Sequence, residues 1–354
     1  MAKYQKNPFA SSGKSSKKRR KQRKRNRMIV RWAGLLVCAG GLVFGAWKLM
    51  QMMDGMKVEG VFASQSAATA VPDPTATPEP TPEPKPVVTL APEQINSNYA
   101  LLVRAKTGEV IWNKGNSSDK VWPASITKVL SALVALEHIE DLNQTFAMPL
   151  NIYQPLFDQN ASMAGFWSGE SPTMQDLLYG TILPSGAEAV TALAIATAGD
   201  EATFIQWMND KAAALGMKNS HFANVWGIYQ EDHYSTPEDL AALMQAALQN
   251  ETLKKIMSTA QYTTAPLAAH AEGVTMEHSV LKNPLTMQAE GFVLEGGKTG
   301  FTDEAGLCLA SFAEKGGEEF VLVTTGAMLA PDQAKTESLH VQDAITIYSA
   351  IQMP

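Results

Sequence analysis

Residues 63–92 are rich in proline and include the run AATAVPDPTATPEPTPEPKPVV, in which proline alternates with alanine, threonine and glutamate. Proline has no backbone N–H group, and a segment with so few large apolar side chains cannot bury a core. The segment is therefore expected to form an extended polyproline-II spacer, although a ligand for a proline-binding module has the same composition. It restricts the folded part of this 354-residue chain to the region from about residue 96 onwards.

Charge is distributed unevenly along the chain. Residues 1–31 hold 13 of the 29 basic residues and no acidic residue. Such a segment can bind nucleic acid, but here it precedes WAGLLVCAGGLVFGAW, which is uncharged and lies between Arg31 and Lys48. We predict an uncleaved transmembrane signal-anchor over residues 28–53 and no nucleic-acid partner. A cleaved signal peptide is the alternative, but Phe44 disrupts the small-residue cleavage site that should follow the apolar run.

The basic excess also sets the expected orientation, because the cytoplasmic flanks of membrane helices are enriched in lysine and arginine. Residues 1–27 would form a basic cytoplasmic tail, and the chain after the anchor would lie outside the cell membrane. A linker rich in Pro, Thr and Glu is expected over residues 54–95, followed by one globular domain over residues 96–354. Of the two cysteines, Cys38 lies in the apolar run. No disulfide is therefore expected in the outer domain, and Cys308 is interpreted as buried apolar filler.

Strands are expected at both ends of the globular region, and helices between them. YALLVRAKTGEVIWNK predicts a hairpin that turns at residues 106–109, while GFVLEGGKTGFT, GLCLASFAEK and EEFVLVTTGAM predict three strands. SITKVLSALVALEHI, DEATFIQWMNDKAAALG and TPEDLAALMQAAL have the apolar spacing and the caps of helices, and a last helix is expected over residues 337–351. The predicted fold class is α+β, with one antiparallel sheet built from N- and C-terminal strands and a large helical subdomain.

The pattern S-x-x-K occurs five times, and its occurrences start at Ser11, Ser15, Ser117, Ser125 and Ser279. The first two lie in the basic head, the third lies in a polar loop, and the last has no helix signal around it. Only Ser125 opens a strongly apolar helix, where free N–H groups and the positive end of the helix dipole collect.

A serine and a lysine three residues apart share one face of a helix, so Lys128 lies close enough to take a proton from Ser125. Burial or a second cation would lower the pKa of the amine enough for it to act as a base. A capping serine beside a solvated lysine gives the same pattern. The motif alone does not decide between the two interpretations.

A second pattern, K-T-G, occurs twice. Residues 106–108 lie in the predicted hairpin turn, where Gly108 suits a positive φ and no function is needed to explain the sequence. Residues 298–300 lie in EGGKTGFTDEAG, where small residues along a strand would let the backbone of a ligand approach.

Taken together, the motifs resemble those of the serine D-alanyl-D-alanine carboxypeptidases, which are low-molecular-mass penicillin-binding proteins of the β-lactamase-like serine peptidase superfamily. The resemblance covers roughly residues 97–350 and is carried by RAKTGEVIW, PASITK, DLLYGTILPSGAEA, LGMKNSHFAN, HYSTPEDLA and GGKTGFTDEAGLCLAS, in that order. It implies a transpeptidase-like fold. It also implies an enzyme without cofactor or metal that removes the terminal D-alanine from peptidoglycan stem peptides through an acyl-enzyme, and that β-lactams inhibit covalently.

The resemblance implies a role for each matching residue. Ser125 would attack the peptide carbonyl, Lys128 would be the base, and Ser185 would help to pass the proton to the departing D-alanine. The N–H groups of Ser125 and Phe301 would form the oxyanion hole.

Three residues of one strand segment would hold the terminal carboxylate of the substrate. They are Lys298, Thr299 and Thr302. Lys298 would also supply the second cation that keeps Lys128 partly neutral.

Three departures from the family pattern stand out. Ala187 replaces the asparagine of the family's Ser-x-Asn motif, and the neighbouring Glu188 is expected to point about 100° away from the site. NVWGI at residues 224–228 differs from the family's usual run, so no role passes to Trp226. The small C-terminal β-domain of many relatives has no counterpart after the last helix, and the stalk and anchor are expected to replace it. A catalytically impaired penicillin-recognising or peptidoglycan-binding protein is therefore the alternative function.

Other enzyme classes fit the sequence less well. The six histidines are scattered, and the pair Glu337 and His340 is expected on a helix surface, so a metal-dependent peptidase is not indicated. No G-x-S-x-G elbow or counterpart of a β-lactamase deacylating glutamate is present. Whether water or an amine accepts the acyl group stays open at this point, as do the preferred stem peptide and the oligomeric state.

Overall fold

The computed structural model describes residues 85–329 and 338–354. The predicted basic tail, the signal-anchor and most of the proline-rich linker lie outside the described residues. In the two described ranges, no helix is both long and apolar enough to cross a membrane. The expectations for residues 1–84 therefore stay predictions.

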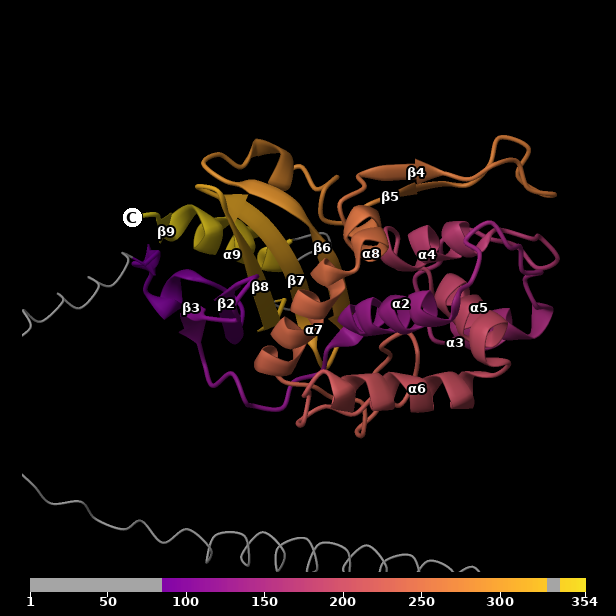
Figure 1. Ribbon diagram of the computed structural model, residues 1–354, viewed down its shortest axis with the longest axis horizontal. Helices are drawn as coiled ribbons and strands as arrows, with labels where there is room; N and C mark the ends of the chain where they lie inside the picture. Colours follow the sequence, from indigo (N-terminus) through magenta and orange to yellow (C-terminus); the bar gives the residue numbers. More distant parts are fainter. Residues whose placement is uncertain (1–84, 330–337) are drawn as a thin grey trace, which may run out of the picture. The chain divides into compact units, whose positions relative to one another are not determined.

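Five strands form one antiparallel sheet in the spatial order β3-β2-β8-β7-β6. Their bounds are β2 Tyr99–Arg104, β3 Val110–Lys114, β6 Val293–Thr302, β7 Gly306–Lys315 and β8 Glu318–Ala327. The β2–β3 hairpin comes from the start of the folded region and pairs with β8, which comes from near its end (Figure 1). This arrangement confirms the predicted sheet built from strands of both ends.

Side chains of β2 alternate between the two faces of the sheet, as the period of a strand requires. Leu101 and Val103 pack into the core shared with the helical region, whereas Ala100 and Leu102 pack into a second core with α9 (Leu339–Ala350). All four are buried, because helices cover the sheet on both faces. The sheet thus separates two apolar cores, in keeping with an α+β layer fold.

The remaining helices lie between β3 and β6 in the sequence. They are α2 Thr127–His138, α3 Tyr153–Asp158, α4 Met174–Ile182, α5 Ala187–Ala198, α6 Glu201–Ala214, α7 Pro237–Gln249 and α8 Glu251–Met257. Helix α2 contacts α4, α5, α6 and α7 and lies at the centre of the helical region (Figure 1). Its residues from Thr127 to Ala135 are all buried, and six of these nine residues are apolar.

Two predicted helix starts are confirmed by their caps. The Asp200 side chain accepts the N–H of Thr203 at 2.8 Å, and the Thr236 hydroxyl accepts the N–H of Asp239 at 3.2 Å. Each cap satisfies a backbone N–H group that has no partner inside its own helix. The local sequence therefore determines where α6 and α7 begin.

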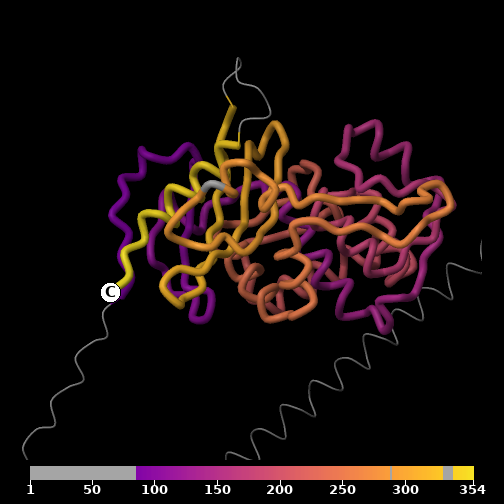
Figure 2. The backbone as a smooth tube through the Cα atoms, turned by 90° about the horizontal axis from the view of Figure 1, so that it is seen from above, coloured from indigo at the N-terminus to yellow at the C-terminus, as the bar shows by residue number. Residues whose placement is uncertain are grey.

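Two small antiparallel pairs complete the described fold. β1 (Val87–Val88) pairs with β9 (Ile351–Gln352), so the first and last described segments lie side by side (Figure 2). β4 (Gln261–Thr263) pairs with β5 (Thr275–Glu277) along the edge of the helical region. The first pair ties the end of the linker to the end of α9.

Burial decides two expectations about single residues. Cys308 in β7 is fully buried, and burial raises the pKa of its thiol to about 12, as expected for apolar filler. The expected surface position of His340 was wrong: its side chain is 7% exposed, because α9 packs against the sheet. Glu337 lies outside the described residues. Among the residues that are described, no group of three His, Cys, Asp or Glu side chains could hold a metal ion.

Candidate active site

Ser125 lies in a tight 3-10 turn, Ala124–Ile126, that leads directly into α2. The sequence predicts a serine at the first turn of an α-helix, and the structure places it one step earlier, where Ala124 has a φ of +47°. A non-glycine residue in this left-handed region is strained and needs support from its surroundings. Gly300 of β6 supplies part of this support, because its backbone packs directly against the turn. A Cβ atom at Gly300 would lie only 2.9 Å from the backbone N of Ser125. Close packing of the β6 backbone therefore fixes the position of the serine.

Lys128 contacts Ser125 directly. Its Nζ atom lies 3.0 Å from the Ser125 Oγ and 2.8 Å from the backbone carbonyl oxygen of Trp226. The lysine side chain is 1% exposed, and burial lowers the pKa of its ammonium group to about 7, against an opposing effect of the Glu188 charge. A neutral amine is therefore well populated near neutral pH and lies within reach of the Ser125 proton.

The Trp226 carbonyl is a contact that the sequence analysis missed. It comes from the loop NVWGI, to which no role was assigned, and the contact uses a backbone atom that every residue type carries. Asn224 shapes this loop, because its Oδ1 accepts the Gly227 N–H at 2.7 Å and its Nδ2 donates to the Ile228 carbonyl at 3.0 Å. The sequence signal for this contact was therefore the asparagine and glycine, rather than the tryptophan.

Lys298 lies in the middle of β6 and is fully buried. Its ammonium group donates to the backbone carbonyl of Thr299 at 2.8 Å. Burial and the neighbouring charge of Lys128 hold the pKa of Lys298 well below its usual range. The two lysines are thus electrostatically coupled. Burial is the main cause of the lowered Lys128 pKa, and the added contribution expected from Lys298 stays a prediction.

The rest of the Lys298 segment borders a cleft. Phe301 and Thr302 line the cleft, and the Thr302 hydroxyl accepts the N–H of Ala305 at 3.0 Å. The Thr299 hydroxyl lies 2.8 Å from the Ser279 hydroxyl. Ser279 starts an S-x-x-K match that has no helix signal around it. Its contact with Thr299 joins segments twenty residues apart, and only the tertiary structure reveals it.

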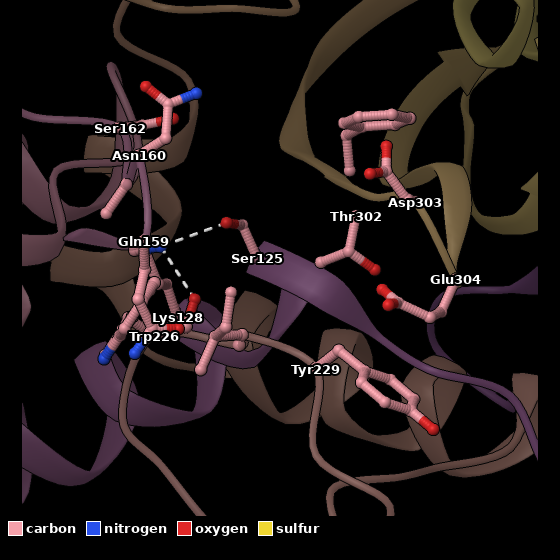
Figure 3. Close-up of a pocket in the computed structure, with 14 residues that line it drawn as sticks. Ser125, Lys128, Gln159, Asn160, Ser162, Trp226, Tyr229, Thr302, Asp303 and Glu304 are labelled. Carbon is pink, nitrogen blue, oxygen red and sulfur yellow. Dashed lines mark hydrogen bonds between the residues drawn. The ribbon is translucent and has the colours of Figure 1, made fainter. Parts of the chain in front are cut away.

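The cleft has a volume of about 450 Å³. Ser125 and Lys128 line it together with three segments, residues 159–162, 226–229 and 301–304. Figure 3 shows Ser125 between the loop that carries Gln159, Asn160 and Ser162 and the segment that carries Thr302, Asp303 and Glu304. A hydroxyl and a buried amine at hydrogen-bond distance, open to a cleft of this size, can form and release a covalent acyl ester.

The sequence of the chain was compared with the profiles of known protein families. The sequence profile described as D-alanyl-D-alanine carboxypeptidase matches residues 86–328. The chain belongs to this family.

Two relatives are each 31% identical to this chain over the aligned region. The D-alanyl-D-alanine carboxypeptidase DacF of Bacillus subtilis is 31% identical over 234 residues, which cover 64% of this chain and 57% of the relative. The D-alanyl-D-alanine carboxypeptidase of Streptomyces strain K15 is 31% identical over 224 residues, which cover 61% of this chain and 75% of the relative. The chain thus spans less than two thirds of the length of the Bacillus protein.

Solved structures share the fold. The crystal structure of the Streptomyces K15 DD-transpeptidase has a TM-score of 0.63 at 27% identity and covers 72% of this chain and 97% of its own. The D-alanyl-D-alanine carboxypeptidase from Mycobacterium tuberculosis has a TM-score of 0.62 at 25% identity, with 72% and 90% covered. These similarities agree with the α+β fold described above.

The second motif of the family falls at residues 185–187. Ser185 has a φ of +66° and is 9% exposed, and its hydroxyl has no hydrogen-bond partner among the described residues. Ala187 is the first residue of α5, is 1% exposed, and donates its N–H to the Ser162 carbonyl at 2.8 Å. The structure therefore brings Ser125 and Lys128 into contact but shows no hydrogen bond from either of them to Ser185.

Glu188, the next residue of α5, directs one carboxylate oxygen to the backbone of a loop. Its Oε1 accepts the backbone N–H groups of Ala164, Gly165 and Phe166 at 2.7, 2.8 and 3.3 Å. Burial raises the pKa of this carboxyl group. Glu188 thus holds the loop that continues from the cleft wall and does not replace the missing asparagine amide.

Proposed function

We propose that the protein is a serine D,D-carboxypeptidase that removes the terminal D-alanine from peptidoglycan stem peptides. The observation that carries this proposal is the 3.0 Å separation between the Ser125 Oγ and a buried Lys128 whose pKa is about 7. A serine hydroxyl becomes a good nucleophile when a neutral base lies next to it. The family assignment supports the choice of a peptide that ends in D-Ala-D-Ala as the substrate.

In the proposed acylation step, the Ser125 oxygen bonds to the carbonyl carbon of the penultimate D-alanine, and Lys128 takes the hydroxyl proton. The tetrahedral oxyanion would accept hydrogen bonds from the backbone N–H groups of Ser125 and Phe301. The C–N bond then breaks, and the proton passes from Lys128, with the help of Ser185, to the amine of the departing D-alanine. Lys298, Thr299 and Thr302 would hold the terminal carboxylate during this step.

In the proposed deacylation step, water attacks the ester carbonyl while Lys128 takes a proton from it. The ester C–O bond breaks, Ser125 regains its proton, and the shortened peptide leaves as a carboxylic acid. A β-lactam presents a similar amide to Ser125 and would form an ester that is released slowly. The name of the Streptomyces K15 structure, a DD-transpeptidase, points to an amine as the other possible acceptor.

We further propose that this activity is located outside the membrane of a bacterial cell, on a single-pass anchor over residues 28–53. The proposal rests on the uncharged run, the basic segment before it and the proline-rich spacer after it. Fractionation of cells that express the full chain tests it. The protein should stay in the membrane fraction at high salt, and protease added to spheroplasts should remove the outer domain.

A direct test uses the purified full-length chain with a peptide ending in D-Ala-D-Ala and measures the released D-alanine. Intact-mass spectrometry after incubation with penicillin should show one added drug molecule. The Ser125→Ala variant should lose both signals, because it lacks the attacking oxygen. Penicillin labelling that survives this substitution would overturn the assignment of Ser125.

Ala187 favours a second candidate function, a penicillin-recognising or peptidoglycan-binding protein with impaired catalysis. The asparagine that the family usually has there would bond both the substrate and the lysine, and losing one such contact costs transition-state stabilisation. The two candidates differ in turnover. Labelling by penicillin without release of D-alanine would establish the binding protein, whereas steady release of D-alanine would exclude it.

A further inference from the structure

His233 lies just before α7, and the reaction proposed above uses no atom of this residue. Its side chain is 1% exposed, and its ring stands edge-on to that of Phe222, with the ring centroids 5.5 Å apart. Both ring nitrogens have hydrogen-bond partners, which are Thr127 and Ala223. These partners belong to two different segments of the candidate active site. The histidine therefore links the two segments inside the protein.

The two hydrogen bonds fix the tautomer of the ring. Nδ1 accepts the backbone N–H of Ala223 at 3.1 Å, and a backbone N–H group can only donate. In the neutral ring Nε2 therefore carries the proton, and it donates a hydrogen bond to the Thr127 hydroxyl, 2.8 Å away. Burial lowers the pKa of His233 to about 4, so the ring is neutral near neutral pH.

Thr127, the first partner, is the first residue of α2 and lies between Ser125 and Lys128 in the sequence. Its side chain is fully buried. Within residues 85–329 and 338–354, the His233 ring is the only hydrogen-bond partner of the Thr127 hydroxyl. The turn that carries the serine and the first turn of α2, which carries the lysine, meet at this residue. A bond to Thr127 therefore restrains the nucleophile and the base together.

Ala223, the second partner, begins the loop of residues 223–228. In this loop the Trp226 carbonyl accepts a hydrogen bond from the Lys128 ammonium group at 2.8 Å. A Cβ atom at Gly227 would lie 1.9 Å from the Ala124 carbonyl oxygen, so the loop backbone packs directly on the strained turn before α2. The position of this loop thus affects both the environment of the amine and the support of the turn.

We propose that His233 is a positioning residue for the Ser125–Lys128 pair. Its neutral ring holds the loop of residues 223–228 against the start of α2, so that the Trp226 carbonyl stays in contact with Lys128. The inference rests on the proposed function, because it assigns His233 to the same acyl transfer. His233 acts through the loop and Thr127 and does not touch the substrate.

The sign of one pKa shift distinguishes this role from a general contribution to stability. A carbonyl acceptor stabilises the ammonium form of Lys128, so losing the Trp226 contact should lower the Lys128 pKa below its value of about 7. A general loosening of the site that admits water would instead raise this pKa towards the usual value of a lysine. The two explanations therefore predict shifts in opposite directions.

Four other titratable groups interact with these two residues. They are Glu188 and Lys298 beside Lys128, and His221 and Asp232 beside His233. The variants used in the test leave all four unchanged. A shift of the Lys128 pKa then reports the position of the loop and not a new charge.

Three variants separate the two halves of the link. The amide of asparagine lies about where Nδ1 does, so His233→Asn can accept from Ala223 but does not reach Thr127. The amide of glutamine lies about where Nε2 does, so His233→Gln reaches Thr127 but leaves the Ala223 N–H without its acceptor. His233→Phe keeps an aromatic ring and loses both bonds.

The test measures the pKa of Lys128 in the purified full-length chain, by competitive acetylation over a pH series with mass spectrometry. His233→Gln and His233→Phe should lower this pKa by about one unit, as expected for losing one hydrogen bond to a charged group. His233→Asn should leave it at about 7. Acylation by penicillin, measured at the plateau above the pKa, should slow about tenfold in His233→Phe, because the serine and the amine are then less well placed.

The matched control is Tyr348→Phe. The Tyr348 hydroxyl lies 3.1 Å from the Ser311 hydroxyl, and Tyr348 is buried in the second core, with α9. The control also removes a buried hydrogen bond and should leave the Lys128 pKa unchanged. Circular dichroism establishes that each variant is folded, and the asparagine and glutamine variants decide the test if His233→Phe does not fold. A Lys128 pKa that is unchanged or raised in His233→Gln would overturn the positioning role.

The pKa measurement requires no turnover, so this inference and the proposed function can fail separately. If D-alanine is released and the His233 variants share the Lys128 pKa of the parent, the carboxypeptidase stands and His233 has no positioning role. If no D-alanine is released while the pKa falls in His233→Gln and not in His233→Asn, the positioning role stands and the carboxypeptidase fails.

Discussion

The tripeptide Lys-Thr-Gly occurs at residues 106–108 and again at residues 298–300, in two different environments. In the first copy Lys106 is exposed in the β2–β3 turn, and the Thr107 hydroxyl accepts the N–H of Glu109 at 3.2 Å. In the second copy Lys298 is fully buried in β6. The first copy shapes its own turn, while the second lies against the candidate active site.

The neighbours of each glycine make the same point. Gly108 has a φ of +72°, and a Cβ atom there would meet only the flexible end of the Gln245 side chain, at 3.3 Å. A Cβ atom at Gly300 would meet the backbone N of Ser125 at 2.9 Å. Three identical residues therefore serve a turn in one place and an active-site wall in the other. The function of such a motif is decided by the segments that pack against it.

The largest expected effect on the acylation rate comes from replacing Lys298, and the matched replacement of Lys106 is its control. Lys298→Ala should slow acylation by penicillin by about 10²–10³-fold, because the cation proposed to bind the substrate carboxylate is lost. Lys106→Ala should leave the rate near that of the parent, because this side chain is solvated. Stopped-flow or mass-spectrometric acylation rates measure both. Equal losses in the two variants, with folding intact, would mean that the wrong copy has been assigned to the site.

The glycines give the next effect. Gly300→Ala should slow acylation by roughly tenfold to a hundredfold, because the added methyl group pushes the Ser125 backbone by overpacking. Gly108→Ala should leave acylation unchanged and instead lower the free energy of unfolding by about 1 kcal/mol, because alanine is strained at positive φ. Acylation rates and urea titrations report the two effects separately. A Gly108→Ala variant that acylates as slowly as Gly300→Ala would break the comparison.

The pH dependence comes third in size. Since burial lowers the Lys128 pKa to about 7, the acylation rate should be half-maximal near that pH and should reach a plateau above it. Below the pKa the amine is protonated, so the rate should fall about tenfold per pH unit. Lys106→Ala should give the same pH profile, because Lys106 lies in the exposed β2–β3 turn and not beside Ser125. A rate that does not change with pH between about 5 and 9 would contradict Lys128 as the base.

The smallest expected effect concerns the second motif, where Ala187 replaces an asparagine. Ala187→Asn should raise the rate of D-alanine release by about fivefold, which corresponds to one net hydrogen bond to the substrate. Ala187→Leu adds a side chain of similar shape without an amide and should give no increase. If the asparagine variant is folded and no faster than the parent, another group already makes the hydrogen bond of the missing amide. Alanine at position 187 then does not limit catalysis.

Local structure followed from the sequence to a large extent. Strand alternation in Tyr99–Arg104, the caps at Asp200 and Thr236, and the turn at Gly108 are all set by residues within a few positions of one another. Side-chain period, capping chemistry and φ preference act over that range, so the sequence alone predicts them. The sheet shared by strands of both ends also followed from the pattern, whereas the pairing of β2 with β8 within it is found only in the structure.

Several features of the site were decided only by the tertiary structure. The Trp226 carbonyl reaches Lys128 across 98 residues of sequence, and Ser279 meets Thr299 between two segments without helix signals. Backbone atoms carry no residue identity, and the hydroxyl contact depends on how two loops pack, so no local pattern encodes either one. The pKa of Lys128 has the same origin, because burial by surrounding helices lowers it, and burial is a property of the folded chain. The sequence therefore determined which residues are present for the chemistry, while packing determined which of them lie in contact and in what charge state.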